Sequence, residues 1–299
     1  MGKKVLAIYY TQSGQMQEII DAFTSTIAAP DVTVEKVQVH PVTNFDFPWT
    51  GKRFFSVMPD CVMGNPRPLQ PYTLNENKYD LIILGYQPWF LSPSIPSSTL
   101  LQDEKFKAVI KDTPVVTISA GRNMWLNAFD KIKLLLADAG AKHVGNVALV
   151  DRHSNPVSFV TIFYWMLKGK KERYLNIFPK PGVSDEDIKK TAVYGEIVNK
   201  HLLSGNWEGL QQQLVDKGAV MIKYPLMVIE GKAKHIFKAW AKIIVKRKNQ
   251  LPWTEAFKYY LFIALFLGAP ILLTLDAFLI RPFTGKQIRN KKKHYLLLN

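Results

Sequence analysis

From Lys4 to about Ser204 the chain alternates between short apolar runs and stretches with helical periodicity. Five of the apolar runs are rich in Val, Ile and Leu, which is typical of strands covered on both faces of a sheet. These predicted strands are Val5–Tyr10, Val32–Val39, Leu81–Gly85, Val115–Ser119 and Val144–Val150. Helices are predicted at Gln15–Ala28, Leu126–Ala139 and Asp185–Leu203. The alternation predicts an α/β domain over residues 1–204, with a five-stranded parallel sheet and helices on both of its faces.

Two long connections interrupt this pattern and are predicted to be insertions. Residues 40–78 are rich in Phe, Trp, Pro and Met and are too long for a plain turn. Residues 154–182 contain the apolar run Val157–Leu167, which is too short to span a bilayer. That run is expected to form either a core helix or a helix that dips into a membrane surface.

The remaining residues, 205–299, are predicted to form a basic helical extension with an apolar membrane segment at Tyr259–Ile280. A helix of that length reaches about 33 Å, enough to cross a bilayer. The preceding stretch, Lys234–Lys248, has the pattern of a basic amphipathic helix suited to an anionic membrane surface. Its predicted apolar face consists of Ile236, Phe237, Trp240, Ile243 and Ile244.

The topology of the apolar segment stays open at the level of sequence. Basic residues flank it on both sides, so the positive-inside rule does not orient it. A break at Pro270 would give a re-entrant hairpin, and Asp276 near one end would reach an interface. We favour monotopic attachment over a full span, with a buried core helix as the alternative. No signal peptide is predicted, so the cytoplasmic face of the inner membrane is the expected location.

Charge and composition narrow the classes of function. The formal net charge is +15, and +12 of it lies between Gly231 and Asn299. The charge therefore belongs to the extension around the apolar segment, and it indicates a membrane partner and no nucleic acid. The single cysteine, Cys61, excludes a disulfide framework. The histidines are scattered without ligand spacing, so no metal site is predicted.

Three loops follow predicted strands at the carboxyl edge of the sheet, where open α/β folds bind ligands. The first, Tyr10–Met16, combines two hydroxyls, a glycine and the amides of a helix N-terminus, which together favour an anion. It contains no lysine and so differs from a P-loop, and an ordinary capped turn is the alternative. The second, Leu84–Pro93, offers aromatic side chains for a planar ring, and the third, Ser119–Trp125, offers small residues for close approach.

In this order and spacing, the three loops resemble those of flavodoxin-like FMN-binding proteins. The resemblance covers about Lys4 to Ser204 and implies the strand order 2-1-3-4-5. It also implies FMN as cofactor. By resemblance the phosphate loop comprises Thr11, Gln12, Ser13, Gly14, Gln15 and Met16, with Gln12 departing from the usual small or hydroxyl residue. The implied ring wall is Pro88, Trp89 and Phe90, and the implied ring-edge residues are Ser119, Gly121 and Asn123.

The opening residues 3–15, the length and the basic apolar extension also resemble bacterial dialkylresorcinol condensing enzymes of aryl-lipid and flexirubin-type pathways. That resemblance implies oxidation of a dialkyl cyclohexanedione to a dialkylresorcinol, a lipophilic substrate and a ketosynthase partner. His153 follows the fifth strand and is the candidate base, and Arg152 is a candidate to stabilise an enolate. Tyr86 is an alternative candidate for the catalytic base.

Two other functions use the same flavin. A flavodoxin-type electron carrier would pass electrons to a partner protein, and an NAD(P)H quinone reductase would act on a different lipophilic ring. Electron carriers of this type tend to be small, acidic and soluble, whereas this chain is basic and extended. The sequence therefore favours a flavin-dependent oxidoreductase.

Overall fold

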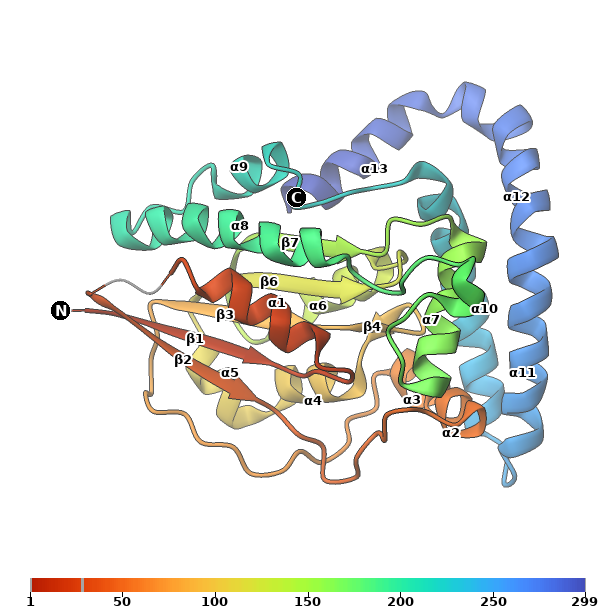
Figure 1. Ribbon diagram of the computed structural model, residues 1–299, viewed down its shortest axis with the longest axis horizontal. Coiled ribbons are helices and arrows are strands. Elements are labelled where there is room, and N and C mark those ends of the chain that lie inside the picture. The colour runs from red at the N-terminus through yellow and green to blue at the C-terminus, as the bar shows by residue number, and fades with distance from the viewer. Residues whose placement is uncertain (1, 28–29, 299) are drawn as a thin grey trace.

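The computed structural model describes residues 2–27 and 30–298, and a five-stranded parallel sheet forms its centre (Figure 1). The strands are β1 (Lys3–Tyr9), β2 (Val32–Gln38), β3 (Leu81–Tyr86), β6 (Pro114–Gly121) and β7 (Lys142–Val150). Their order is β2-β1-β3-β6-β7, which confirms the predicted 2-1-3-4-5 order of a flavodoxin-like fold. Two short strands, β4 (Pro88–Trp89) and β5 (Ser92–Pro93), form a separate hairpin directly after β3.

The alternation of side chains along each strand divides the core into two layers. Val5, Ala7 and Tyr9 of β1 pack on one face of the sheet, whereas Leu6 and Ile8 pack on the other. The central strands are apolar on both faces because helices cover both faces.

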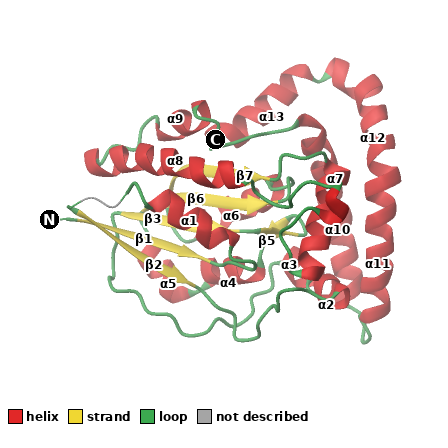
Figure 2. Cartoon of the chain, viewed as in Figure 1, coloured by secondary structure: helices red, strands yellow, loops and turns green. Residues whose placement is uncertain are grey.

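Helices α1 (Gln15–Thr24) and α8 (Asp185–Ser204) pack together on one face. On the other face lie α4 (Ile95–Gln102), α5 (Glu104–Ile110) and α6 (Leu126–Asp138) (Figure 2). The first predicted helix is shorter than expected, and its last residue, Ala28, lies outside the described residues. Helices α4 and α5 were not predicted. The apolar positions of α4 show little amphipathic contrast because nearly all of its residues are buried, and α5 is only seven residues long.

Both insertions carry helices and lie next to each other at the carboxyl edge of the sheet. The first forms α2 (Gly51–Ser56) and α3 (Met58–Met63), and the second forms α7 (Asn155–Lys168) and a short turn at Tyr174–Asn176. The two insertions are joined where the Trp49 backbone N–H donates to the Met166 carbonyl at 2.7 Å.

The packed core continues past residue 204. Helix α9 (Leu210–Asp216) lies on β7, and Val220 forms a parallel bridge with Ala148 at the edge of the sheet. The last helix, α13 (Gly285–Leu297), returns to this region and buries Tyr295 in the core.

Between these segments the chain forms a helical hairpin along the carboxyl edge of the sheet (Figure 1). Its first arm is α10 (Tyr224–Val245), and its second is a continuous helix from Leu251 to Phe283 that includes α11 (Leu251–Ile263) and α12 (Ala269–Leu275). The helix continues through Pro270, so the break that would give a re-entrant hairpin, left open by the sequence, does not occur. A π-helical turn at Ala264–Gly268 precedes this proline, and such a turn absorbs the lost backbone hydrogen bond without ending the helix.

The second arm is long and apolar enough to cross a membrane, with a mean hydropathy of 2.3 in its most apolar stretch. One stripe of it faces the protein and contains Phe257, Leu265, Ala269 and Asp276. Asp276 is buried and accepts a hydrogen bond from the Tyr224 hydroxyl at 2.7 Å. The sequence had suggested instead that Asp276 would reach a membrane–water interface. The opposite stripe is exposed and apolar, and it includes Tyr259, Ile263, Phe266, Leu267, Ile271, Leu275, Phe278 and Leu279.

The buried and exposed faces of α10 differ from those predicted for this stretch. Phe237, Ala241 and Ile244 are buried against the protein, whereas Ile236 and Ile243 are exposed among the lysines. The predicted apolar face is therefore split, because α10 packs on α3 and the second arm of the hairpin instead of resting alone on a surface.

The crossing of α1 and α8 generates a stability prediction. An added Cβ at Gly195 would lie 2.0 Å from the Phe23 carbonyl oxygen, so the helices would have to separate. We expect Gly195→Ala to lower the free energy of unfolding by about 2 kcal/mol or more, measured by urea denaturation. Gly51→Ala, at a helical position with no atom within 4 Å, should leave stability nearly unchanged. Equal stability of the two variants would contradict the close crossing.

Candidate active site

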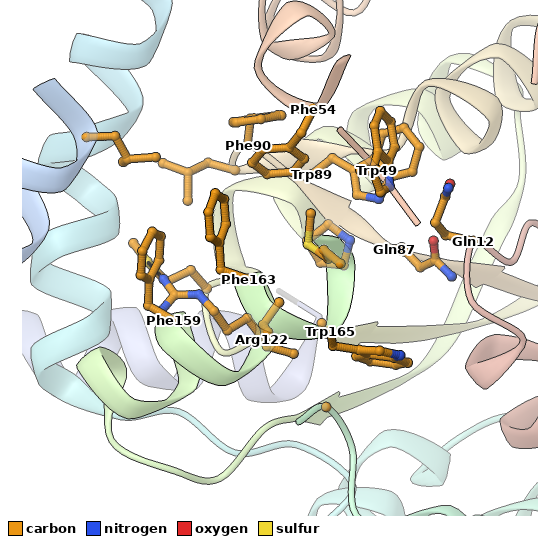
Figure 3. Close-up of a pocket in the computed structure, with 18 of the residues that line it drawn as sticks. Gln12, Trp49, Phe54, Gln87, Trp89, Phe90, Arg122, Phe159, Phe163 and Trp165 are labelled. Carbon is orange, nitrogen blue, oxygen red and sulfur yellow. Dashed lines mark hydrogen bonds between the residues drawn. The ribbon is translucent and has the colours of Figure 1, made fainter. Parts of the chain in front are cut away.

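A cavity of about 290 Å³ lies at the carboxyl edge of the sheet and joins the three loops to the helical hairpin (Figure 3). Its polar end is lined by Gln12, Ser13, Gln15 and Gln87. Toward the helical hairpin the lining becomes aromatic and aliphatic. Among the described residues that line the cavity, Arg122 is the one that carries a full charge at neutral pH.

The first loop keeps several donors free for an anion. None of the hydrogen bonds among described residues uses the backbone N–H of Gln12, Ser13, Gly14 or Gln15. The Thr11 hydroxyl is buried and has no partner among the residues that the structure describes. Gly14 has φ +86°, a left-handed conformation that suits glycine and turns the chain into α1. These features fit a phosphate at the helix N-terminus.

The side chains of two glutamines in this loop form hydrogen bonds with other parts of the protein. Gln12 accepts from the Tyr10 hydroxyl and donates to the Phe45 carbonyl at 2.5 Å, which joins the loop to the first insertion. Gln15 exchanges two hydrogen bonds with the backbone of Val183, at 3.1 and 3.2 Å. Their backbone amides are what remain available to a ligand.

The second loop is the β4–β5 hairpin, whose two turn residues are strained. Phe90 and Leu91 have φ values of 47° and 58°, although neither is glycine. Each left-handed residue of this size costs about 1–2 kcal/mol. The turn persists because Phe90 packs against Phe54 and Phe257, at ring-centre distances of 4.7 and 6.3 Å. The insertion and the helical hairpin thus hold the aromatic wall of the cavity in place.

Arg122 projects from the third loop into the cavity next to Phe159 (Figure 3). Its guanidinium donates to the Asn155 carbonyl and side-chain oxygens at 3.0 and 2.7 Å, and it lies 5.6 Å from the Phe159 ring centre. Burial lowers the pKa of Arg122 to about 10, while Asp151 and Glu230 oppose that shift. The side chain therefore stays cationic at neutral pH.

Eight of the twelve residues predicted to bind a cofactor line the cavity: Gln12, Ser13, Gln15, Met16, Pro88, Trp89, Phe90 and Gly121. Thr11 and Gly14 belong to the same phosphate loop. Ser119 and Asn123 do not line the cavity, and their polar atoms are buried in the core without partners among the described residues. The third loop presents Gly121, Arg122 and Met124 to the cavity in their place.

None of the three predicted catalytic residues lines the cavity. His153 is exposed in the loop after β7. Arg152 makes a two-pronged ion pair with Asp187, at 2.7 and 2.5 Å, in the first turn of α8. Tyr86 is fully buried in the core below the sheet edge, and burial raises the pKa of its hydroxyl. The sequence places these residues at the carboxyl ends of β3 and β7, but it does not show in which direction their side chains point.

Several lining residues were missed at the level of single positions. The insertions contribute Phe47, Trp49, Phe54, Phe159, Phe163 and Trp165. The aromatic richness of both insertions is the available signal, and it identifies the segments without identifying which rings point inward. The helical hairpin contributes further apolar residues, which local sequence does not connect to the loops at all.

Glu230 of α10 attaches the helical hairpin to the sheet domain. One of its carboxyl oxygens accepts the backbone N–H of Asn127 at 2.7 Å, and the Asn127 side chain donates to the Glu230 carbonyl at 2.9 Å. The carboxyl group thus caps α6 from another helix. Its second oxygen is buried without a partner among the described residues, and burial raises the pKa of Glu230 to about 7.

Neither a protein-family model nor a curated protein sequence matches this chain. Similar solved structures include a flavoprotein from Lactobacillus acidophilus NCFM in complex with FMN, at 23% identity over 49% of this chain and 93% of that chain, with a TM-score of 0.38. Flavodoxin 1 from Bacillus cereus is 16% identical over 67% of this chain and 97% of that chain, with a TM-score of 0.34. A flavone reductase is 11% identical over 67% of this chain and 63% of that chain, with a TM-score of 0.36. These TM-scores are too low to support an argument. The assignment of this chain to the flavodoxin-like fold class rests on its own strand order, β2-β1-β3-β6-β7.

The buried Glu230 generates a prediction of pH dependence. Its folded pKa of about 7 exceeds the ordinary 4.5, so the folded state holds a proton that the unfolded chain releases between these pH values. This group therefore stabilises the fold below about pH 4.5, and its contribution is lost as the pH rises through 7, by about 2–3 kcal/mol. We expect Glu230→Gln to unfold at a higher temperature than the parent at pH 8 and to lose less stability between pH 5 and pH 8.

The matched control is Glu196→Gln, which removes a carboxylate with 58% side-chain exposure from α8. Its pH profile should parallel that of the parent in the same thermal unfolding series. A Glu230→Gln profile that also parallels the parent would show that this carboxyl is not protonated in the folded protein.

Proposed function

We propose that this protein is a membrane-associated, FMN-dependent oxidoreductase that aromatises a dialkyl cyclohexanedione to a dialkylresorcinol. One observation carries the proposal: a single cavity joins a phosphate-type loop and an aromatic wall to an apolar chamber. A flavin phosphate and ring match the first part, and a ring with alkyl substituents matches the second. The resemblance of residues 3–15 and of the extension to dialkylresorcinol condensing enzymes supports this choice of ring.

The first loop would hold the FMN phosphate through the backbone amides of residues 12–15 and the hydroxyls of Thr11 and Ser13. Pro88, Trp89 and Gly121 would lie against the ring, and an added Cβ at Gly121 would come within 3.0 Å of Pro88. The chemistry that FMN supplies when bound is acceptance of a hydride.

Arg122 fits the role of charge stabilisation in this reaction. A cyclohexane-1,3-dione loses the proton between its carbonyls readily, because the charge spreads over two oxygens. Loss of that proton and of one hydride removes the two hydrogens by which the dione exceeds a resorcinol, and enolisation completes the aromatic ring. A partly buried cation beside the ring oxygens lowers the energy of the enolate. The chain therefore contributes a positive charge at the ring oxygens, held by Asn155 and Phe159.

The helical hairpin supports attachment to a membrane surface. Its second arm lies along the protein and buries one stripe, so only the outer apolar stripe is available to lipid. That geometry favours a helix lying in the interface over a full span. The cytoplasmic face of the inner membrane remains our proposal for its location, with a ketosynthase as the source of the ring.

Other uses of a flavin remain outcomes of the experiments. An electron carrier needs an accessible flavin edge, whereas α7, α10 and α11 line the cavity in front of the loops. A quinone reductase would use the same cavity with a quinone as hydride acceptor. Reduction of a quinone by NAD(P)H, together with unchanged dione, would replace our proposal with that activity.

Flavin binding is tested at the phosphate loop. We expect the purified protein to hold FMN, detected by its visible absorption, and Ser13→Glu to lose it, because a carboxylate would repel the phosphate. Ser25→Glu adds the same charge at an exposed position at the other end of α1 and should retain FMN. Parent protein that stays colourless after incubation with FMN would refute the flavin assignment.

The reaction is tested with a dialkyl cyclohexanedione and a dye as final electron acceptor, with the product identified by mass spectrometry. We expect Arg122→Met to lower kcat/KM by about 10²–10³, the usual effect of losing one charge-stabilising donor. Arg173→Met removes an exposed positive charge that does not line the cavity and should keep parental turnover. Equal turnover of the Arg122 variant and the parent would exclude the proposed role of this cation.

A further inference from the structure

The apolar end of the cavity is built by the C-terminal helical hairpin. Its lining residues here are Ile229, Ala233 and Phe237 from α10, and Tyr260, Leu261, Ala264, Leu265 and Ala269 from the second arm. Apart from the Tyr260 hydroxyl, these side chains carry no hydrogen-bonding group. A polar substituent placed here would lose its water without gaining a partner, so this end accepts hydrocarbon.

Three of these residues are alanines, contributed by both arms of the hairpin. Ala233 lies on α10, and Ala264 and Ala269 lie one turn apart on the second arm. The other apolar side chains that line the cavity from these helices include Ile229, Phe237, Leu261 and Leu265, so the small alanine side chains leave space where larger ones would close the cavity.

The wall between this space and the surroundings is one helix thick. The second arm lines the cavity with Leu261 and Leu265, and it exposes Ile263 and Leu267 on its outer stripe, at 60% and 62% exposure. Hydrocarbon therefore contacts both sides of the same helix when the outer stripe rests in lipid. A molecule with an alkyl chain would find a matching environment in the bilayer and in the cavity.

Arg122 marks where this apolar space meets the polar part of the cavity. Figure 3 shows its side chain beside Phe159, with Gln12 and Gln87 on the far side toward the phosphate loop. A ring whose oxygens contact Arg122 would direct a substituent either toward the loops or toward the hairpin. The space between the alanines lies on the hairpin side.

We propose that the helical hairpin is the alkyl-chain compartment of the active site, and that Ala233, Ala264 and Ala269 set the chain length that the protein accepts. The extension is then part of the substrate site as well as the membrane contact. The inference rests on the proposed function only for the identity of the ring.

The test compares ligands of different chain length on the full-length protein in nanodiscs. Binding of 5-hexylresorcinol, 5-dodecylresorcinol and 1-dodecanol is followed by quenching of tryptophan fluorescence, with partitioning measured on empty nanodiscs. We expect Ala264→Phe and Ala233→Phe to weaken binding of the dodecyl ligands about tenfold or more, because several methylene groups lose their buried site. Binding of the hexyl ligand should change less than about twofold.

Ala256→Phe is the matched control, because Ala256 lies exposed on α11 and does not line the cavity. It should bind all three ligands as the parent does. Ala264→Leu adds a smaller side chain, and it should accept chains of intermediate length if the phenylalanine variant fails to fold. Thermal unfolding of each variant identifies such a failure.

Loss of hexyl and dodecyl binding together in a folded Ala264 variant, or loss of neither, would overturn the inference. The proposed function fails separately. If 1-dodecanol binds with the expected sensitivity to Ala264→Phe while the dione is not oxidised, the chain compartment stands without the aromatising activity. If the dione is oxidised but chain length has no influence in any variant, the compartment is refuted and the activity stands.

Discussion

The capping of α6 by Glu230 is the interaction on which the arrangement of the site depends. A carboxyl group from α10 meets the backbone N–H of Asn127 in a buried position, and Asn127 returns a hydrogen bond to the same turn of α10. Both partners would lose hydrogen bonds if the helices separated, and each unsatisfied buried group is costly. The helical hairpin is therefore held at one distance from the sheet, and the cavity between them has a defined shape.

The aromatic packing around the β4–β5 hairpin depends on this placement. Phe257 of the second arm contacts Phe90, which together with Leu91 adopts a strained left-handed turn. The strain is tolerated because packing from the first insertion and from the helical hairpin leaves no other position for the turn. The wall of the cavity and the long apolar helix thus form one packed unit, so a shift of that helix would change the shape of the site.

Much of the fold follows from local pattern. The apolar strands and the helices that start at Gln15, Leu126 and Asp185 begin where the sequence predicts them, because burial on both faces and helix capping leave local signatures. The loop at residues 10–16 was located for the same reason, since a hydroxyl-rich turn between a strand and a helix is local chemistry. His153, Arg152 and Tyr86 were placed at the right edge, yet their side chains turn toward solvent, toward Asp187 or into the core.

The sequence by itself determined the class of strand order, the position of the hydroxyl-rich loop between the first strand and the first helix, and the presence of a basic extension around an apolar helix. These depend on periodicity, turn residues and charge, which neighbouring residues carry. Tertiary structure decided that the apolar helix continues through Pro270, that it walls the cavity with Leu261 and Ala264, and that Arg122 is its charged group. The last two properties arise from contacts between segments more than a hundred residues apart, and no local pattern records which faces of two helices meet.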